Sequence, residues 1–216
     1  YLFDNDDNTP LWSYKTGHRI YDVDISDNGG HIVAGSMDNK LYLFGSADNT
    51  PLWTFEHTDN SYRPENHQWF KVAISGDGNY VIAGIDQGEG WYYLFSTNDN
   101  MPIWIFRNYE VRDVAISGDG SRITGGGWGG KAFVFSNGDN VPVWYHAPSF
   151  RPSSVGISSD GTLVVHGESV YLNLHRGGFY AYNLRIGGQD NPKRVLTTTP
   201  QFSFRVPDNV YAFRIQ

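Results

Sequence analysis

The sequence predicts an all-β protein, a β-propeller built of four-stranded antiparallel blades, and three observations lead to that prediction. A motif of the form Asp-Asn-x-Pro-apolar-Trp occurs four times and ends at Trp12, Trp53, Trp104 and Trp144. These tryptophans are 41, 51 and 40 residues apart, and a β-rich repeat of roughly 40–50 residues is typical of a propeller blade. Aromatic residues make up 16% of the chain and glycines number 25, a composition that suits short strands joined by tight turns.

Each repeat contains four short apolar runs, which we expect to be strands. The first run alternates apolar and polar residues, as from Val23 to Ile25, and is followed by a hairpin turn such as Asn28-Gly29. The second run ends on glycine, at Gly35 in the first repeat, which predicts a close backbone approach. The fourth run holds the repeated motif. Because proline cannot donate to a sheet ladder, we expect this strand at the outer edge of its blade, with the tryptophan packed between blades.

The repeats predict a single propeller domain that spans residues 1–216. We place four blades at approximately 20–56, 70–107, 111–146 and 153–198, and a fifth at 201–216 together with 1–15. In this interpretation both termini close the last blade and remove the exposed sheet edges. The alternative is an open fragment of a six- to eight-bladed propeller, and a chain that starts inside a repeat suits either interpretation.

Two stretches resemble known propeller repeats. The segment from Lys40 to Trp53 is similar to the repeat of quinoproteins, in which an aromatic strand leads through a turn to a strand tryptophan. The Ile-Ser-x-Asp-Gly segments at 74–78 and 157–161 resemble the inner hairpin of WD repeats. On these motifs the chain resembles the PQQ-like and WD-repeat-like β-propeller families over essentially its whole length. The quinoprotein side of this resemblance implies a quinone-dependent dehydrogenase-like module.

The connections that vary between repeats indicate where function lies. From the motif tryptophan to the next inner-strand valine the chain takes 11, 10 and 11 residues in three repeats but 19 between Trp53 and Val72. The connection from the second to the third strand also lengthens, at 85–90 and 168–178. In an up-and-down blade these two kinds of connection share one end of the sheets. Insertions gathered on one face of a repeat array usually mark its binding face.

Aromatic and arginine side chains are typical anchors of protein interfaces, and the expanded loops carry several of them. The candidate ligand-binding or partner-binding residues are Tyr62, Arg63, His67, Trp69, Trp91, Trp128, His175 and Arg176. The alternative is that Trp69 and Trp91 only cover the ends of blades. In the second strand, His166 replaces the small residues of the other repeats, and we expect a buried structural histidine there.

Composition limits the possible functions. The net charge of −7 argues against nucleic acid as a partner, and no apolar run reaches the roughly 20 residues of a membrane span. The chain has no cysteine, and it lacks a nucleophile elbow, a phosphate-binding loop and a histidine pair with metal-binding spacing. Carboxylates near the inner strands, such as Asp22, Asp24 and Asp113, are the residues that a carbohydrate-active propeller would use.

We therefore expect a non-catalytic binding or scaffold propeller that presents its expanded-loop face to a protein or a glycan, with no cofactor, no metal and no catalytic residues. A carbohydrate-binding or carbohydrate-active propeller is the alternative, and a quinone-dependent dehydrogenase-like module is less favoured. The sequence leaves the location of the protein open, with a cell-surface or secreted place favoured.

Overall fold

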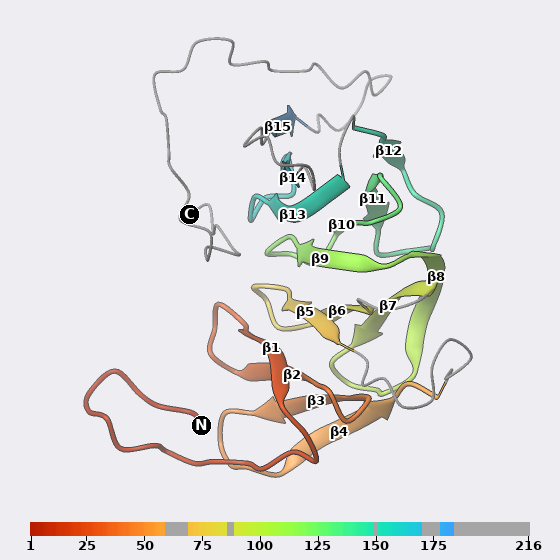
Figure 1. The fold of residues 1–216 in the computed structure, drawn as a ribbon. Coiled ribbons are helices and arrows are strands. Elements are labelled where there is room, and N and C mark those ends of the chain that lie inside the picture. Colours follow the sequence, from red (N-terminus) through yellow and green to blue (C-terminus); the bar gives the residue numbers. More distant parts are fainter. Residues whose placement is uncertain (59–68, 86–88, 149–150, 170–177, 184–216) are drawn as a thin grey trace.

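The computed structural model describes residues 1–58, 69–85, 89–148, 151–169 and 178–183, and it confirms the all-β propeller prediction. Successive sheets follow one another along the chain, one sheet to a blade (Figure 1). The first blade contains β1 (Ile20–Ile25), β2 (His31–Ser36), β3 (Lys40–Gly45) and β4 (Pro51–Glu56); the second contains β5 (Phe70–Ile74), β6 (Tyr80–Ile85), β7 (Glu89–Ser96) and β8 (Pro102–Tyr109). The third contains β9 (Val111–Ile116), β10 (Arg122–Gly127), β11 (Ala132–Ser136) and β12 (Trp144–His146), and the fourth contains β13 (Arg151–Ile157), β14 (Leu163–Ser169) and β15 (Gly178–Asn183).

Every sheet is an antiparallel meander in which the strands pair in chain order. The strand with the repeated motif is therefore the last of its blade, as the prolines predicted. Pro51 opens β4 opposite Phe44, and the pairing register of β3 with β4 shifts at that point. The same shift occurs where Pro102 lies opposite Phe95. A proline has no N–H for the ladder, so the irregularity falls where the donor is missing.

The hairpin turns between the first and second strands are built alike in all four blades. A glycine with a φ between +66° and +75° follows the Asp or Asn in each turn, at Gly29, Gly78, Gly120 and Gly161. In the second blade the Ser75 hydroxyl donates to Asp77 Oδ1 (2.6 Å), and the Tyr80 N–H donates to the Ser75 Oγ (3.0 Å). Asp-Gly thus supplies the left-handed backbone that the prediction required.

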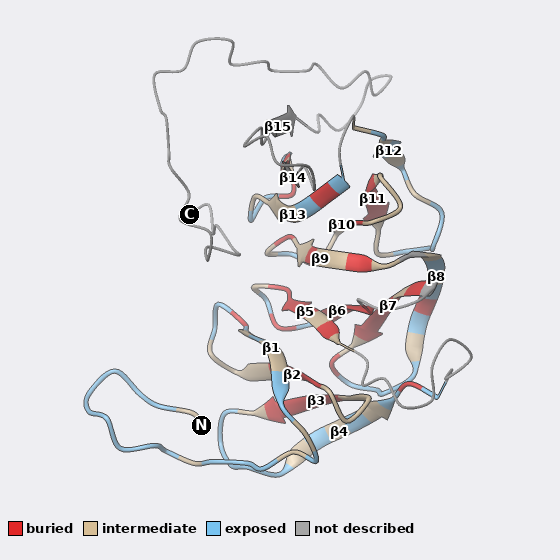
Figure 2. Ribbon diagram, in the orientation of Figure 1, coloured by how far each residue is buried: buried red, intermediate tan, exposed pale blue. Residues whose placement is uncertain are grey.

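The core lies between blades, where neighbouring sheets pack face to face. Val33, Leu41 and Leu43 of the first blade pack against the second blade at residues that include Val72 and Phe95. A separate cluster fills the space between the second and third blades. Figure 2 shows this arrangement, with buried residues concentrated in the middle strands of each blade.

The second strands come close to the following blade at their terminal glycines. A Cβ placed on Gly35 would lie 2.5 Å from the Phe70 Cβ, so a larger residue does not fit there. The predicted close approach is therefore confirmed.

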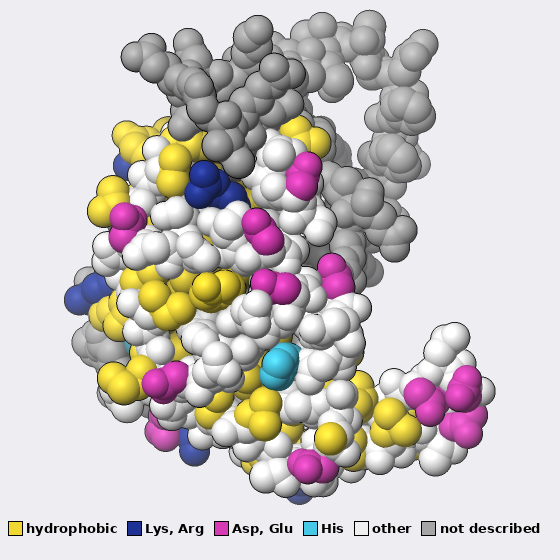
Figure 3. Space-filling model, turned by 180° about the vertical axis from the view of Figure 1, so that it is seen from behind, with side chains coloured by type: hydrophobic (Ala, Val, Ile, Leu, Met, Phe, Trp, Pro, Cys, Tyr) yellow, Lys and Arg dark blue, Asp and Glu magenta, His cyan; other side chains and the backbone are white. Residues whose placement is uncertain are grey.

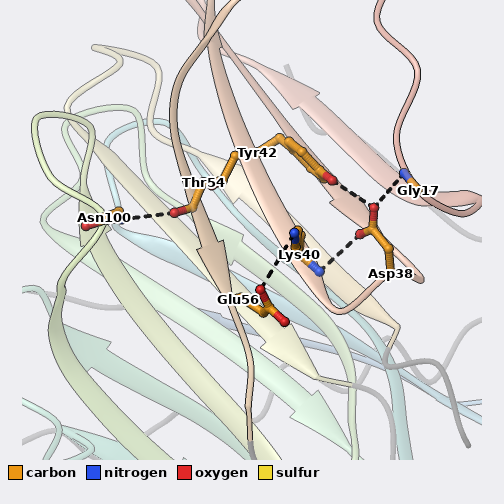
Figure 4. A network of polar contacts seen from close by, with 7 residues as sticks. All are labelled: Gly17, Asp38, Lys40, Tyr42, Thr54, Glu56 and Asn100. Carbon is orange, nitrogen blue, oxygen red and sulfur yellow. Dashed lines mark hydrogen bonds and ion pairs between the residues drawn. The ribbon is translucent and has the colours of Figure 1, made fainter.

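The repeated motif joins each blade to the next by a reciprocal pair of hydrogen bonds, which we call the outer latch. The Trp53 indole N–H of the first blade donates to the Thr97 carbonyl of the second (2.9 Å). The Asn100 amide of the second blade donates back to the Thr54 carbonyl (3.0 Å; Figure 4). The Trp53 ring also packs against Phe95, with centroids 5.5 Å apart. The expectation that the motif tryptophans pack between blades is confirmed here.

The outer latch recurs at each described junction before the fourth blade. The bonds are Trp12 to the Ser46 carbonyl with Asn49 to the Ser13 carbonyl, and Trp104 to the Asn137 carbonyl with Asn140 to the Ile105 carbonyl.

The N-terminal residues occupy the place of the outer strands of a preceding blade. Leu2 and Trp12 form an antiparallel bridge, and the Trp12 ring packs against Phe44 at 5.4 Å between centroids. On the inner strand, Val23 is 60% exposed, whereas its counterpart Val72 is 6% exposed because the first blade covers it. The predicted closure by residues 201–216 and the end of the fourth blade lie outside the described residues, so the five-blade ring stays a prediction.

The inner strands are joined by a second device, which we call the inner clasp. Carboxylates on one strand accept hydrogen bonds from backbone N–H groups of the next blade's first strand. Asp24 Oδ2 accepts from the Ile74 N–H (2.9 Å), and Asp113 Oδ2 accepts from the Val155 N–H (2.8 Å). Asp22 acts in the same way toward the second blade. These three carboxylates, which a carbohydrate-active site would have used, thus bond to the scaffold.

Burial changes the acidity of the inner clasp. Burial away from solvent raises the pKa of Asp113 to about 7. The hydrogen bonds from the Val155 and Val114 N–H groups and the charge of Lys71 act in the opposite direction and lower this pKa. Burial also raises the pKa of Asp22, and Lys71, whose Nζ lies 4.0 Å from Asp22 Oδ2, counteracts it. A carboxyl group with a pKa raised in the folded state stabilises the fold at low pH, and that contribution is lost as the pH rises through the folded-state pKa.

We predict that Asn100→Ala lowers the free energy of unfolding by about 1 kcal/mol, because it removes the amide that bonds to the Thr54 carbonyl. Urea unfolding followed by tryptophan fluorescence measures this. Asn98→Ala is the matched control, since the Asn98 amide bonds only within its own turn, to the Ser96 Oγ at 3.4 Å. If both variants lost the same free energy of unfolding, the hydrogen bond from Asn100 to Thr54 would not contribute to stability.

We predict that the stability of the wild type relative to Asp113→Asn falls as the pH rises between about pH 5 and about pH 8. The slope is at most about 1.4 kcal/mol per pH unit, because one proton is released. Asparagine does not titrate, so the difference between the two proteins isolates Asp113. Urea unfolding at both pH values tests this, and a difference that is constant with pH would show that Asp113 does not titrate in this range.

Candidate functional site

Three of the predicted site residues fall in the described ranges, and they lie at one end of the blades. The connections from strand four to strand one and from strand two to strand three form this end, which we call the variable end. Trp69 directly precedes β5, Trp91 lies near the start of β7, and Trp128 follows β10. These three tryptophans do share one end of the sheets, but they form three separate clusters. Five other predicted residues lie outside the described residues, namely Tyr62, Arg63, His67, His175 and Arg176.

The Trp69 cluster (Tyr21, Trp69 and Lys71) bridges the first and second blades at their inner strands. The Trp69 ring stacks on Tyr21, with centroids 5.1 Å apart and an interplanar angle of 20°. The ammonium group of Lys71 lies 4.9 Å from the centroid of the same Tyr21 ring. A cation over an aromatic face is attracted by the ring quadrupole, so the two blades are joined here by one aromatic stack and one charge.

The Trp91 cluster (His57, Trp91, Tyr93 and Arg107) covers the outer part of the same junction. Trp91 stacks on Tyr93 with an interplanar angle of 11°, and the Arg107 guanidinium lies 4.2 Å from the Trp91 centroid. His57 is buried beneath them, with its Nδ1 2.8 Å from the Tyr93 hydroxyl. The apolar core between the blades continues up to Trp91, which is partly buried against it.

The Trp128 cluster (Arg112, Trp128 and Arg151) lies at the junction of the third and fourth blades. The Arg112 guanidinium lies 4.6 Å from the Trp128 centroid and the Arg151 guanidinium 4.4 Å from it. The backbone N–H of Trp128 donates to the Glu110 carbonyl at 3.0 Å, which fixes the turn that carries the ring. Two positive charges from adjacent blades therefore converge on one indole.

Sequence reasoning missed Arg107, Arg112 and Arg151. A signal was present, because Arg112 and Arg151 both stand at the start of an inner strand, where Lys71 stands in the second blade. The sequence does not show how close Arg112 and Arg151, which belong to different blades, lie to each other.

A hydrogen-bond network at the variable end holds the first blade to the connection that enters it (Figure 4). Asp38 Oδ2 accepts from the Gly17 N–H (2.8 Å) and from the Tyr42 hydroxyl (2.7 Å). Burial, together with the hydrogen bond to Asp38, raises the pKa of Tyr42. Lys40 lies 3.6 Å from Glu56 beside this network. These hydrogen bonds hold the backbone at Gly17 against the first blade, and they occupy the Asp38 carboxylate.

His166 is fully buried, as expected of a structural histidine. Its Nε2 lies 3.1 Å from the Nδ1 of His146 in the third blade, and the rings are stacked with centroids 5.2 Å apart. Burial, with the nearby His146, lowers the pKa of His166 to about 4. The pair takes the place of the aromatic contacts that Phe55 and Phe106 make at the earlier junctions.

Among the residues that the structure describes, no group of three or more His, Asp or Glu side chains is placed to hold a metal ion. No helix in the same ranges is long and apolar enough to cross a membrane.

Comparisons with known proteins agree with this architecture. The family described as WD domain, G-beta repeat matches residues 8–45, which include the first blade up to β3 and the residues before it. A solved structure of U3-55K matches with a TM-score of 0.64 at 12% sequence identity, over 79% of this chain and 50% of that chain. The chain thus spans about half the length of that structure. No curated protein sequence matches the chain.

The repeat match and the structural likeness rest on different evidence, and both point to one architecture. The match to U3-55K supports the fold alone at this identity, and the WD-repeat match falls on the segment that holds the Asp38 network. The PQQ-like part of the resemblance has no support. Together these findings support a β-propeller fold, with similarity to a WD repeat over residues 8–45.

Proposed function

We propose that this propeller is a non-catalytic binding module that holds a protein partner at its variable end. The repeat match and the propeller neighbour support a scaffold or binding propeller in general. One observation supports the location: the three tryptophan clusters, each with a Lys or Arg over an aromatic ring, all lie at the end where connection lengths differ between repeats. Tryptophan and arginine are the residues most enriched in interface hot spots.

The stacking of these rings favours a protein over a glycan. A sugar that stacks on tryptophan needs a bare ring face. Trp91 is already stacked by Tyr93 and covered by Arg107, and two guanidinium groups lie over Trp128. Such clusters present guanidinium edges and ring edges, which suit the mixed polar and apolar contacts of a protein surface.

The test substitutes Trp69, Trp91 and Trp128 together by Ala and compares partner capture from the source cells with that of the wild type. We expect the variant to capture about tenfold less partner than the wild type, or less still. Truncation of a hot-spot residue reduces the binding free energy by about 2 kcal/mol or more. Quantitative mass spectrometry measures the capture. Thermal unfolding checks folding, and Trp128→Ala alone serves where the triple variant is unstable, since Trp128 lies in a turn.

The matched control removes exposed apolar side chains from the motif itself. Leu11, Leu52 and Val141 are between 56% and 66% exposed, and we expect their joint substitution by Ala to leave capture unchanged. If the tryptophan variant captured the same partners as the wild type and this control, the variable end would not be the binding site.

A further inference from the structure

In the part of the chain that the structure describes, most basic side chains lie at one end of the blades. Nine Lys and Arg residues fall in the described ranges, and all but Arg122 lie at the variable end. The residues at the variable end are Lys15, Arg19, Lys40, Lys71, Arg107, Arg112, Lys131 and Arg151. In a chain whose net charge is −7, this distribution gathers most of the described cations at the variable end.

The opposite end is acidic for a structural reason. The turns there carry Asp27, Asp48, Asp77, Asp99, Asp119, Asp139 and Asp160. Most of these carboxylates accept hydrogen bonds within their own turns, as Asp48 does from the Thr50 N–H at 2.7 Å. Hydrogen bonds from Ser158 and Thr162 lower the pKa of Asp160 to about 2. Figure 3, which views the molecule from behind, shows Asp and Glu side chains at many places on the described surface and Lys and Arg side chains at fewer.

Of the three tryptophan clusters, the Trp128 cluster is the one in which two guanidinium groups lie over a single ring. The guanidinium group of arginine is planar, so an arginine whose guanidinium stacks on an indole can still form hydrogen bonds through N–H donors in the plane of the group. Those donors match the two oxygens of a carboxylate. Arg112 and Arg151 come from adjacent blades and converge on Trp128, so two such donor sets lie beside one ring.

We propose that the partner docks through an acidic segment of polypeptide, whose Asp or Glu carboxylates bind Arg112 and Arg151 at the junction of the third and fourth blades. This inference rests on the proposed function and names the chemistry of its partner. The surrounding lysines and arginines would steer an acidic segment toward this end and raise its association rate.

The pattern of charges favours a polypeptide over a long polyanion. Acidic residues are interspersed among the cations of the variable end, at Asp38, Glu56, Glu89, Glu110 and Glu168. A nucleic acid or a sulfated glycan needs a continuous basic track along its evenly charged backbone. A protein segment can place its carboxylates opposite Arg112 and Arg151 alone and meet the other positions with neutral side chains.

The experiment measures the binding of a short fluorescent peptide of alternating Glu and Ser, with a peptide in which Gln replaces every Glu as reference. We expect the wild type to bind the Glu peptide more tightly, and more weakly as salt rises. Arg112→Gln with Arg151→Gln should weaken this binding about tenfold or more, because hydrogen bonds to charged groups are lost. Arg122→Gln, which removes the cation of the opposite end, is the matched control and should leave it unchanged.

Arg112→Lys with Arg151→Lys is a second variant, which keeps both charges but removes the planar donor set. Intermediate binding is expected from it. The proposal would be overturned if the Glu and Gln peptides bound equally, if Arg122→Gln weakened binding as much as the double Gln variant, or if a single-stranded oligonucleotide or a sulfated oligosaccharide bound more tightly than the Glu peptide.

The two proposals fail in different ways. A captured partner that is lost from the tryptophan variant but retained by the double Gln variant would refute acidic docking and leave the binding end in place. A partner retained by both variants would refute the proposed function itself.

Discussion

The structure depends on the outer latch between neighbouring blades. A single sheet buries only part of its apolar surface, and its two faces become a core only when the next sheet lies at a fixed distance and register. The latch supplies that register, because Trp53 reaches forward to Thr97 while Asn100 reaches back to Thr54. One motif therefore determines both where the outer strand begins and how it contacts the following blade.

The outer latch and the inner clasp both engage side chains in contacts between blades. These contacts leave the repeated residues of the opposite end and of the inner strands little freedom to bind a partner. The motif tryptophan and asparagine are engaged at the described junctions before the fourth blade, and Asp24 and Asp113 accept backbone hydrogen bonds from the next blade. A residue bonded in this way to a neighbouring sheet is constrained by that sheet. The variable end has local contacts of its own, such as those of Asp38, which need no copy in other blades.

Features that repeat could be predicted from the sequence, and features that join two particular blades could not. The strands, the glycine turns and the close approach of Gly35 followed from periodicity and from the limits that backbone geometry places on residue types. The shared end of Trp69, Trp91 and Trp128 followed from strand alternation. The division of these tryptophans into separate clusters could not be predicted. Aligning the repeats gives the position of each residue along its strand, but it gives no distance between residues of different blades.

The same reasoning explains the convergence of Arg112 and Arg151 on Trp128. In the sequence, Arg112 and Trp128 belong to one repeat and Arg151 belongs to the next. No sequence feature marks the three residues as neighbours. Inner strands of adjacent blades lie side by side, however, so residues near the starts of consecutive inner strands are brought together at the junction between two blades. A charge at that position therefore acts at a junction rather than on one blade, and two arginines in consecutive repeats make a site that neither repeat contains alone.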